Sequence, residues 1–415
     1  MKRRPALVFL LLWLLASFIG AAGFFGTAAI DSRPAVFVSA GSILYLSVFV
    51  LLSFLVYRKN RLLWKLTITA IALLAAALVV LLLPLRDQAP QLSMLQGEKF
   101  WHMKDGTAIA YLHAAPPKRP GKYPVLFVHG GPGTPNMKGD ASFFGKLARD
   151  GYDVYLYDQA GSGLSSRLDN PLQYTTQRAV DELEEIRTKI RAEKLILIGH
   201  SNGGKIAAAY MKAYPEHAEK AVLISPGPLS AEDKSGGNLK SRLNRAESLA
   251  LYQELLHPRV MAAYLLLQVN PAAAKNFAGD HEMDARFINV YEKTEKTLHC
   301  NAKTGKKLQG TGFYANQAPQ SAAFPAETDI KGEIAPRVPV LIFKGSCDYL
   351  SWSSAVQYKK QMPRAELVYF PHAGHNLYED SPAAALEEIR AFLSGKKLPA
   401  APLQSVSRPK GYEGA

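Results

Sequence analysis

The chain has 415 residues, 48% of them hydrophobic, and a formal net charge of +14 at pH 7. The charge is uneven, because residues 1–90 carry a net +7, residues 396–415 carry +3, and the long stretch between them carries only +4. A phosphate-binding surface needs its lysines and arginines gathered on one folded face, so this distribution argues against a nucleic-acid partner. The two cysteines, Cys300 and Cys347, are too few for a disulfide framework or a cysteine-based metal site.

The first 90 residues hold three long apolar segments, at about 6–30, 35–57 and 66–85. Roughly 20 helical residues cross a hydrocarbon core about 30 Å thick, so each segment is long enough to be a transmembrane helix. The first segment also resembles a secretory signal, because a basic start precedes it and small residues follow at 20–22. We favour an uncleaved anchor, since the apolar run continues to Ile30. We therefore expect a membrane segment over residues 1–90, in contact with a lipid bilayer.

The basic residues of the short connections predict how these helices are oriented. They cluster before the first segment and between the second and third, whereas Arg33 and Arg86 stand alone in the other two connections. Clustered lysines and arginines stay on the cytoplasmic side of a membrane. The expected protein is therefore an integral, multi-pass membrane protein with a cytoplasmic N-terminus. Everything after residue 85 should be extracytoplasmic, whether or not the first segment is cleaved.

After a linker at 91–97, short apolar runs alternate with amphipathic helical patterns. The predicted strands are 125–130, 154–159, 195–200, 221–226, 340–345 and 367–370, and the clearest helices are 175–192 and 381–393. Apolar strands that alternate with helices indicate a mostly parallel α/β sheet covered on both faces. The rhythm stops over 227–336, which we predict to be an inserted helical lid between two parts of the core, 98–226 and 337–395. The Pro-rich, basic tail at 396–415 is expected to be disordered.

The sequence LILIGHSNGGKIAAAY at 195–210 places Ser201 between a predicted strand and a predicted helix. Its pattern G-x-S-x-G is typical of a sharp strand-to-helix turn that presents the serine oxygen above the sheet. Gly199 and Gly203 must be small there, so that strand and helix can approach each other. The helix N-terminus behind the serine favours a developing anion. An ordinary turn is the alternative, but the flanking strand and helix favour a catalytic nucleophile.

A serine nucleophile needs a base, and the base needs an acid that orients it. Asp348 follows the strand at 340–345 and His375 follows the strand at 367–370. The resulting chain order, Ser201, Asp348, His375, is the order that this architecture uses. His372 is the competing base, and we interpret it as an ordinary loop residue. We prefer His375 because Gly374 frees its loop and a helix begins six residues later.

The glycine-rich sequence HGGPG at 129–133 follows the apolar run VLFV. Backbone N–H groups in such a loop can approach a substrate without a side chain in the way. We assign the oxyanion hole to the N–H groups of Gly131 and Asn202. The residues expected to support the site, without reacting themselves, are His129, Gly130, Asp158, Gln159, Gly199 and Gly203. The glycines after Gln159 lack the third glycine of a dinucleotide fingerprint, and no zinc-protease motif or P-loop occurs, so we expect no cofactor and no metal.

These motifs together resemble the α/β-hydrolase superfamily. The resemblance rests on VHGGPG (128–133), DQAGSGLS (158–165), GHSNGG (199–204), Asp348 and the Gly-His pair at 374–375, and it covers about residues 100–393. HGGPG together with DQ-x-G-x-G-x-S is most similar to the prolyl iminopeptidase branch. That branch usually has Gly before its serine and Trp after it, whereas this chain has His200 and Asn202, which are closer to general esterases and lipases.

The resemblance implies an α/β-hydrolase fold with an inserted helical lid, here preceded by three transmembrane helices. It implies a serine hydrolase with a Ser-His-Asp triad that works through an acyl-enzyme intermediate. It further implies that acids of the lid bind the free amino group of a peptide substrate. By residue type the candidates are Glu247, Glu254 and Glu282, although each is more simply interpreted as a solvated helix charge.

Three functions stay open at this point. The leading one is a prolyl-aminopeptidase-like enzyme that cleaves small peptides or amides, which HGGPG favours. A carboxylic-ester hydrolase for small or lipid-derived esters is favoured by GHSNGG and by the nearness of lipid. A catalytically silent binding module held at the membrane is the third, and a complete triad argues against it. The oligomeric state stays open. A pairing of Cys300 with Cys347, which an extracytoplasmic location permits, would tie the lid to the loop of Asp348.

Overall fold

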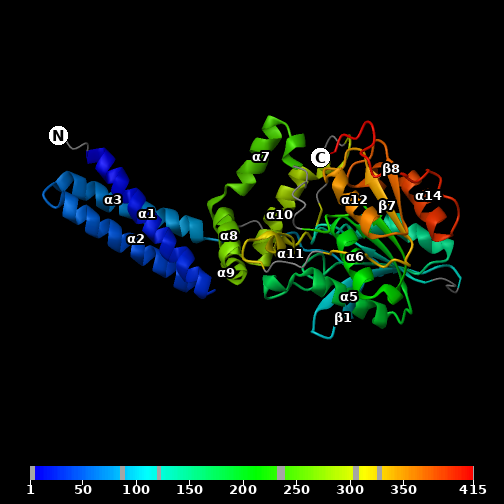
Figure 1. The fold of residues 1–415 in the computed structure, drawn as a ribbon. Coiled ribbons are helices and arrows are strands. Elements are labelled where there is room, and N and C mark those ends of the chain that lie inside the picture. The colour runs from blue at the N-terminus through cyan, green and yellow to red at the C-terminus, as the bar shows by residue number, and fades with distance from the viewer. Residues whose placement is uncertain are drawn as a thin grey trace.

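The computed structural model describes residues 5–84, 89–118, 123–230, 239–301, 308–324 and 330–414. Figure 1 shows two parts, a bundle of three long helices at the N-terminal end and a larger α/β unit. The basic residues at 2–4 and Arg86, on which the predicted orientation partly rests, lie outside the described residues.

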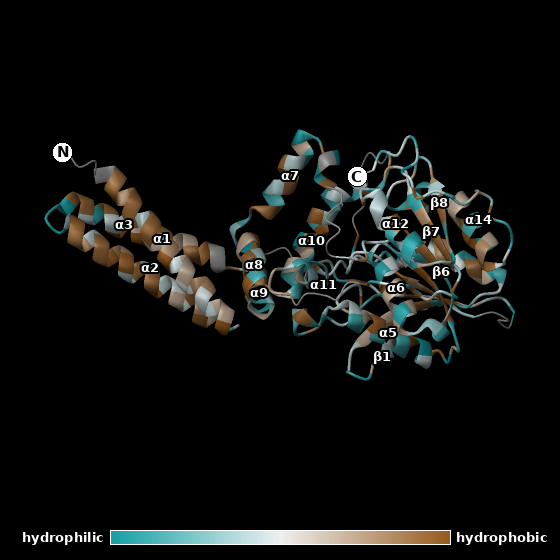
Figure 2. Cartoon of the chain, viewed as in Figure 1, coloured by the Kyte–Doolittle hydropathy of each residue, from teal (hydrophilic) through white to brown (hydrophobic). Residues whose placement is uncertain are grey.

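The bundle consists of α1 (Pro5–Ile30), α2 (Pro34–Tyr57) and α3 (Arg61–Leu82). All three helices are long and apolar enough to cross a membrane, and Figure 2 shows that hydrophobic residues predominate along them. Small residues let α1 and α2 pack closely, because a Cβ atom on Gly20 would stand 2.7 Å from the Tyr45 Cβ. Such close packing is common between membrane helices, where water drives no association.

The α/β unit is built on one eight-stranded sheet with the order β1-β2-β4-β3-β5-β6-β7-β8. The strands are β1 (Lys99–His102), β2 (Ala108–Ala114), β3 (Val125–Val128), β4 (Val154–Tyr157), β5 (Leu195–His200), β6 (Ala218–Ile224), β7 (Val340–Gly345) and β8 (Ala365–Phe370). β2 runs antiparallel to both of its neighbours, and the other strands are parallel. The predicted fold class, a mostly parallel α/β-hydrolase sheet, is confirmed.

Helices cover both faces of this sheet. The covering helices are α4 (Met137–Phe144), α5 (Thr176–Lys189), α6 (Asn202–Ala213), α12 (Trp352–Gln361), α13 (Leu377–Asp380) and α14 (Pro382–Leu393). Side chains alternate across β5, so Leu195 and Leu197 pack with α5, α6 and α12, while Ile196 and Ile198 pack with α4 and α14. A strand that is apolar on both sides is therefore buried on both sides, as its unbroken hydrophobic sequence requires. Short 3-10 turns lie at Gly145–Asp150, Pro171–Gln173, Pro215–His217, Leu239–Arg242, Lys296–Leu298 and Ala318–Gln320.

Between β6 and β7 the chain forms a helical insertion, which we call the lid. Its helices are α7 (Arg245–Leu255), α8 (Pro258–Val269), α9 (Pro271–Phe277), α10 (Asp280–Glu295) and α11 (Phe313–Gln317). In Figure 1 the lid lies between the sheet and the bundle. One apolar cluster joins the two, since Ala28 and Phe37 of the bundle pack with Val260 and Phe277 of the lid. Asn270 Nδ2 adds a 2.9 Å hydrogen bond to the Ala28 carbonyl, so the lid is packed directly on the bundle.

The C-terminal tail is ordered, and the prediction of disorder for 396–415 is wrong over the described residues. Leu398 and Tyr412 are buried, and the Tyr412 hydroxyl donates to the Leu350 carbonyl at 2.9 Å. The Trp352 indole donates to the Val406 carbonyl at 2.8 Å. Composition misled the prediction because disorder follows from a lack of apolar burial, and two well-placed apolar side chains are enough to hold a short segment.

A disulfide joins Cys300, in the part of the lid between α10 and α11, to Cys347 in the loop after β7, with the two Cα atoms 5.4 Å apart. This separation lies within the ordinary range for a disulfide. The bond places the lid and the loop of Asp348 in covalent contact, as the sequence suggested for a paired state.

Replacing Tyr412 by Ala should lower the free energy of unfolding by about 3 kcal/mol, because a buried aromatic ring and its hydrogen bond are lost. Thermal unfolding of the full chain in detergent measures the effect. Val406→Ala is the matched control, since its side chain is 38% exposed and only its carbonyl contacts Trp352. Equal midpoints for the two variants would mean that the tail does not pack on the sheet.

Candidate active site

Ser201 lies at the turn between β5 and α6 in a strained backbone conformation. Its φ is 53° and its ψ is −119°, a combination that a residue with a side chain adopts only when its surroundings impose it. The glycines on either side are required by space. A Cβ atom on Gly199 would stand 2.5 Å from the Gly203 carbonyl oxygen, and one on Gly203 would stand 2.0 Å from the Val128 oxygen. The turn is therefore as tight as the G-x-S-x-G pattern predicts.

His375 and Asp348 meet at the ends of neighbouring strands. The loop after β8 carries His375, and its Nδ1 lies 2.8 Å from Oδ1 of Asp348, in the loop after β7. The same carboxylate oxygen accepts the Leu350 N–H at 3.0 Å, and both side chains are buried. Because an ionised carboxylate only accepts, Nδ1 carries the proton and Nε2 is left as a base. His375 and Ser201 line the same cavity.

The second oxygen of Asp348 is held by Lys344, a residue that the sequence analysis did not consider. Lys344 is fully buried in β7, and its Nζ donates to Asp348 Oδ2 at 2.7 Å and to the Leu350 carbonyl at 2.8 Å. Burial by itself would raise the pKa of Asp348, but Lys344 and His375 outweigh it and hold that pKa well below its usual range. A charged residue inside the apolar run VLIFKG was the available signal, since a buried lysine requires a partner.

His200 and Tyr349 also contact His375. His200 Nε2 donates to the His375 carbonyl at 3.1 Å, and burial together with the neighbouring His375 lowers the pKa of His200 to about 3, so its ring is neutral. The Tyr349 ring lies 4.6 Å from the His375 ring, centroid to centroid, and Tyr349 lines the same cavity as Ser201. His200, the residue before Ser201, thus holds the loop of His375 in place.

The HGGPG loop passes directly beside Ser201. A Cβ atom on Gly130 would stand 2.9 Å from the Ser201 Cβ, and Gly131, with a φ of 115°, lines the cavity together with Asn202 at the start of α6. His129 fixes this loop, because its Nδ1 donates to the Gly130 carbonyl at 2.8 Å and its Nε2 accepts the Gln159 N–H at 3.1 Å. Burial lowers the pKa of His129 to about 4, so it is neutral in this network.

Gln159 and Asp158 hold the loop at 158–165. Gln159 Nε2 donates to the His129 carbonyl at 2.7 Å, which ties this loop to HGGPG. Asp158 is buried, and its Oδ2 accepts the Leu164 N–H at 2.9 Å. Burial raises the pKa of Asp158 to about 7. Asp158 therefore acts on the loop conformation, and Gln159 acts on the neighbouring glycine loop.

A cavity of about 660 Å³ opens over Ser201, between the carboxyl ends of the strands and the lid. Part of its wall is apolar and comes from α7 and α10, namely Leu251, Leu255, Phe287 and Val290. Another part is acidic, with Glu295 at the end of α10 and Glu379 in α13. A volume of this size suits a small molecule or a short peptide.

The three lid acids proposed from the sequence are placed differently from that expectation. Glu282 is buried in an ion pair with Arg259, Nε to Oε1 2.5 Å, so its interpretation as a solvated helix charge is wrong. Glu247 pairs with Lys296, and Glu254 lies 3.4 Å from Arg286. None of the three lines the cavity among its described residues. Among the acids that do line the cavity are Glu295 and Glu379, which the sequence analysis missed because nothing local in the sequence marks them.

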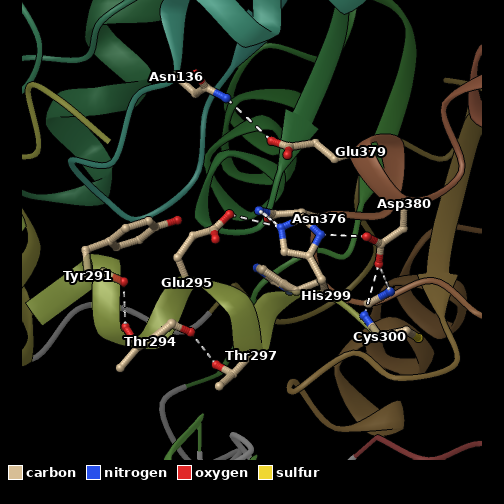
Figure 3. Close-up of polar contacts among 12 residues, drawn as sticks. Asn136, Tyr291, Thr294, Glu295, Thr297, His299, Cys300, Asn376, Glu379 and Asp380 are labelled. Carbon is tan, nitrogen blue, oxygen red and sulfur yellow. Dashed lines mark hydrogen bonds and ion pairs between the residues drawn. The ribbon is translucent and has the colours of Figure 1, made fainter. Parts of the chain in front are cut away.

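Figure 3 shows His299 between two carboxylates at the border of the lid and the His375 loop. Its Nδ1 lies 2.5 Å from Asp380 Oδ1 and its Nε2 lies 3.0 Å from Glu295 Oε1. Burial opposes the charged ring, but the hydrogen bonds to Asp380 and Glu295 outweigh it and raise the pKa of His299 to about 9. Asp380 Oδ2 in turn accepts the N–H groups of Gly374, at 2.7 Å, and Cys300. The lid is thus joined through a charged imidazolium to the residue that precedes His375.

Glu295, His299 and Glu379 each bring a ligand atom within 4.8 Å of the others, a spacing compatible with a metal ion. Both ring nitrogens of His299 are already held by carboxylates, and a metal ligand must be a neutral imidazole. The protonated His299 already supplies the positive charge that a metal ion would bring to these carboxylates, so we assign no metal to these residues.

Comparison with known proteins identifies the fold family of this chain. The model of the α/β-hydrolase fold family matches residues 123–382. A 1-acylglycerol-3-phosphate O-acyltransferase (ABHD5) of Rattus norvegicus is 26% identical over 289 residues, covering 65% of this chain and 76% of the relative. The proline iminopeptidase of Levilactobacillus brevis is 27% identical over 280 residues, covering 65% and 88%.

Two solved structures align with about seven tenths of this chain. The proline iminopeptidase of Mycobacterium smegmatis aligns with a TM-score of 0.48 and 20% identity, covering 72% of this chain and 98% of that one. An esterase from Exiguobacterium antarcticum aligns with a TM-score of 0.47 and 15% identity, covering 71% and 99%.

The His299 network predicts a pH-dependent stability. The folded-state pKa of about 9 lies above the ordinary 6.5, so the stabilisation is complete below pH 6.5 and is lost as the pH rises through 9. His299→Gln should therefore destabilise the chain most below pH 6.5, by up to about 3 kcal/mol, and progressively less toward and above pH 9. Thermal unfolding at a series of pH values measures the difference between variant and wild type.

The control for this series is His372→Gln, because His372 is exposed in a loop. Its difference from wild type should be small and independent of pH. A pH-independent difference for His299→Gln as well would show that His299 is not charged in the folded protein.

Proposed function

The chain belongs to the α/β-hydrolase fold family, and on that premise we propose that it is a serine hydrolase with Ser201 as nucleophile, His375 as general base and Asp348 as orienting acid. The observation that carries the proposal is the 2.8 Å contact between His375 Nδ1 and Asp348 Oδ1, beside a serine held at positive φ in the same cavity. No cofactor is needed for such chemistry.

In the proposed reaction the Ser201 oxygen attacks the carbonyl carbon of the substrate while His375 Nε2 takes the hydroxyl proton. Asp348 keeps the proton of the imidazole on Nδ1 and stabilises the imidazolium that forms. His375 then protonates the leaving amine or alcohol, and the bond to that group breaks. Water, activated by the same histidine, attacks the acyl-enzyme and releases the acid.

The negative charge of the tetrahedral intermediate is assigned to the N–H groups of Gly131 and Asn202. Both residues line the cavity at Ser201, and Asn202 begins α6, so the positive end of a helix lies behind the oxyanion. His129 and Gln159 support this arrangement, because their hydrogen bonds fix the loop that carries Gly131. A preorganised donor pair of this kind is typically the largest contribution to acyl-transfer catalysis.

For the substrate we propose a small peptide or amide with a free amino terminus, as in the prolyl iminopeptidase branch. Glu295 and Glu379 supply two carboxylates to the wall of the cavity that holds Ser201, and such groups suit an ammonium ion. The proline iminopeptidases of two bacteria among the relatives, at 27% and 26% identity, support this choice.

A carboxylic-ester hydrolase is the second candidate. The apolar wall supplied by α7 and α10, with Leu251 and Phe287, suits an acyl chain, and the residues that flank Ser201 are His200 and Asn202. The relative named as an acylglycerol-phosphate acyltransferase also has a lipid-like substrate in its name. A silent binding module remains the third candidate, and covalent labelling distinguishes it from both enzymes.

We further propose that the enzyme is anchored in a membrane by α1–α3 and that the hydrolase unit is extracytoplasmic. Length and apolarity of the three helices support the anchor. The basic residues between α2 and α3, including Lys59, support the extracytoplasmic location, because clustered basic residues stay on the cytoplasmic side and α3 then leads out of the cytoplasm.

Ser201→Ala should abolish turnover and labelling by a fluorophosphonate, with a loss of up to about 10⁶ in rate where a triad acts as a unit. His375→Ala should be nearly as damaging, whereas His372→Ala, in the same loop, should stay within about tenfold of wild type. Substantial activity in pure Ser201→Ala would remove Ser201 as nucleophile, and a reversed order of the histidine variants would remove His375 as base. A wild-type chain that neither labels nor turns over substrate would support the silent module.

Aminoacyl amides with a free and an acetylated amino group, together with short acyl esters, separate the two enzymatic candidates. An aminopeptidase should lose activity when the amino group is acetylated, because acetylation removes the positive charge that the carboxylates of Glu295 and Glu379 would bind. Glu295→Gln should raise KM for the free amine and leave ester hydrolysis nearly unchanged. Equal turnover of free and acetylated substrates, with faster turnover of esters, would favour the esterase.

The topology is tested with single cysteines, since the native pair is joined in a disulfide. Ala383→Cys lies on the exposed part of α14, and Lys59→Cys lies in the connection between α2 and α3. A membrane-impermeant maleimide added to intact spheroplasts should label Ala383→Cys and not Lys59→Cys. The opposite pattern would place the hydrolase unit in the cytoplasm.

A further inference from the structure

The lid exposes two apolar stripes on adjacent helices, which we call the lid face. They consist of Leu249, Tyr252 and Leu256 on or next to α7, and Met261, Leu265 and Val269 on α8. The side chains recur at intervals of three and four residues, so each set lies on one side of its helix. Their exposed fractions lie between 38% and 60%, which is unusual for six large apolar residues in one short stretch. We propose that this face is a membrane-docking surface that rests on the leaflet at which the bundle ends.

The acidic residues of α7 are turned away from the lid face. Glu247 pairs with Lys296, and Glu254 pairs with Arg286 and Lys293 of α10, so both carboxylates are neutralised inside the lid. α8 contains no acidic residue, and its Arg259 is buried against Glu282. The lid face therefore presents no carboxylate, which removes the repulsion that an anionic bilayer would exert on it.

The position of α8 relative to the bundle argues for lipid as the occupant. α8 packs against α1 and α3, and Asn270 at its end donates to the carbonyl of Ala28, close to the last residue of α1. A 24-residue apolar helix is about 36 Å long, enough for a hydrocarbon core of about 30 Å, so the end of α1 lies at the membrane surface. A helix in contact with that end lies at the same level.

Residues at the border of the lid face fit the headgroup region. The Lys240 ammonium lies 5.3 Å from the centre of the Tyr252 ring, and Arg245 is exposed at the start of α7. Tyrosine suits an interface because one end of its ring is apolar and the other is polar, and basic side chains reach phosphates from such positions. In Figure 1, α7 lies on the side of the hydrolase unit nearer to the bundle, and Figure 2 shows hydrophobic residues along it.

A lipid-facing surface can be tested by fluorescence quenching on the full chain. Leu256→Cys and Leu265→Cys place a single reactive thiol on the lid face, and Ala383→Cys places one on α14, away from the bundle in Figure 1. Each variant is labelled with bimane and reconstituted into vesicles of phosphatidylcholine and phosphatidylglycerol. Quenching is measured with a phosphatidylcholine that carries a nitroxide near the head of its acyl chain, and separately with iodide in water.

Bimane on Leu256→Cys and Leu265→Cys should lose most of its fluorescence to the nitroxide lipid and be shielded from iodide, and bimane on Ala383→Cys should behave in the opposite way. Quenching of the two lid variants by iodide alone would overturn the proposal. Protection from both quenchers would also overturn it, since a second copy of the chain or another protein would then cover the face. The readout needs no turnover, so it is independent of the proposed hydrolase activity.

Discussion

The carboxylate of Asp348 is completely buried, with Lys344 on one oxygen and His375 on the other. An isolated charge in that position would be very costly, and the fold can place it there only because a second buried charge lies 2.7 Å away. Lys344 comes from β7 and His375 from the loop after β8, so the geometry of two neighbouring strands sets the angle of the imidazole. Removing Lys344 alone would leave an uncompensated carboxylate, whereas removing the whole group would mainly affect the proposed chemistry.

The same principle of paired burial explains the lid. Its buried charged residues are paired. Arg259 pairs with Glu282 inside the lid, and Asp284 of the lid contacts Arg167 of the core, Nη2 to Oδ2 3.0 Å. Arg167 belongs to the loop beside Asp158, so this contact joins the lid to the core. The lid is therefore held by specific polar contacts as well as by its apolar cluster, and the side that faces away from these contacts is left apolar.

The fold and much of the site were accessible from sequence because they depend on local patterns. Unbroken apolar runs such as LILI at 195–198 indicate buried parallel strands. The tight turn at Ser201 needs glycines two residues before and two residues after the serine, and the sequence shows both. The order of the residues along the chain, with each one after a predicted strand, then predicted Asp348 and His375 as partners of Ser201. Contacts between distant segments carry no such local mark. His299 and Asp380 are separated by 81 positions, and neither has a neighbour in the sequence that indicates the other.

Predictions from residue type alone were wrong where the burial of a side chain determines its role. Glu247, Glu254 and Glu282 were reasonable candidates by charge, yet each is consumed by a partner that the sequence does not identify. The tail was misjudged for the converse reason, because its prolines and basic residues suggested disorder, although Leu398 and Tyr412 are buried against the core. Composition averages over residues, whereas packing depends on the one or two that reach a pocket.

The disulfide between Cys300 and Cys347 has a mechanical consequence for the lid. The segment of the lid that follows α10 is fastened to the core covalently and, next to that bond, through His299 and Asp380. The first helix of the lid, α7, is held instead by ion pairs to Arg286 of α10 and to Lys296, which water can replace. We therefore expect any widening of the cavity to involve α7 rather than the segment around Cys300. His375, the proposed general base, lies next to the fastened segment, because the Gly374 N–H donates to Asp380.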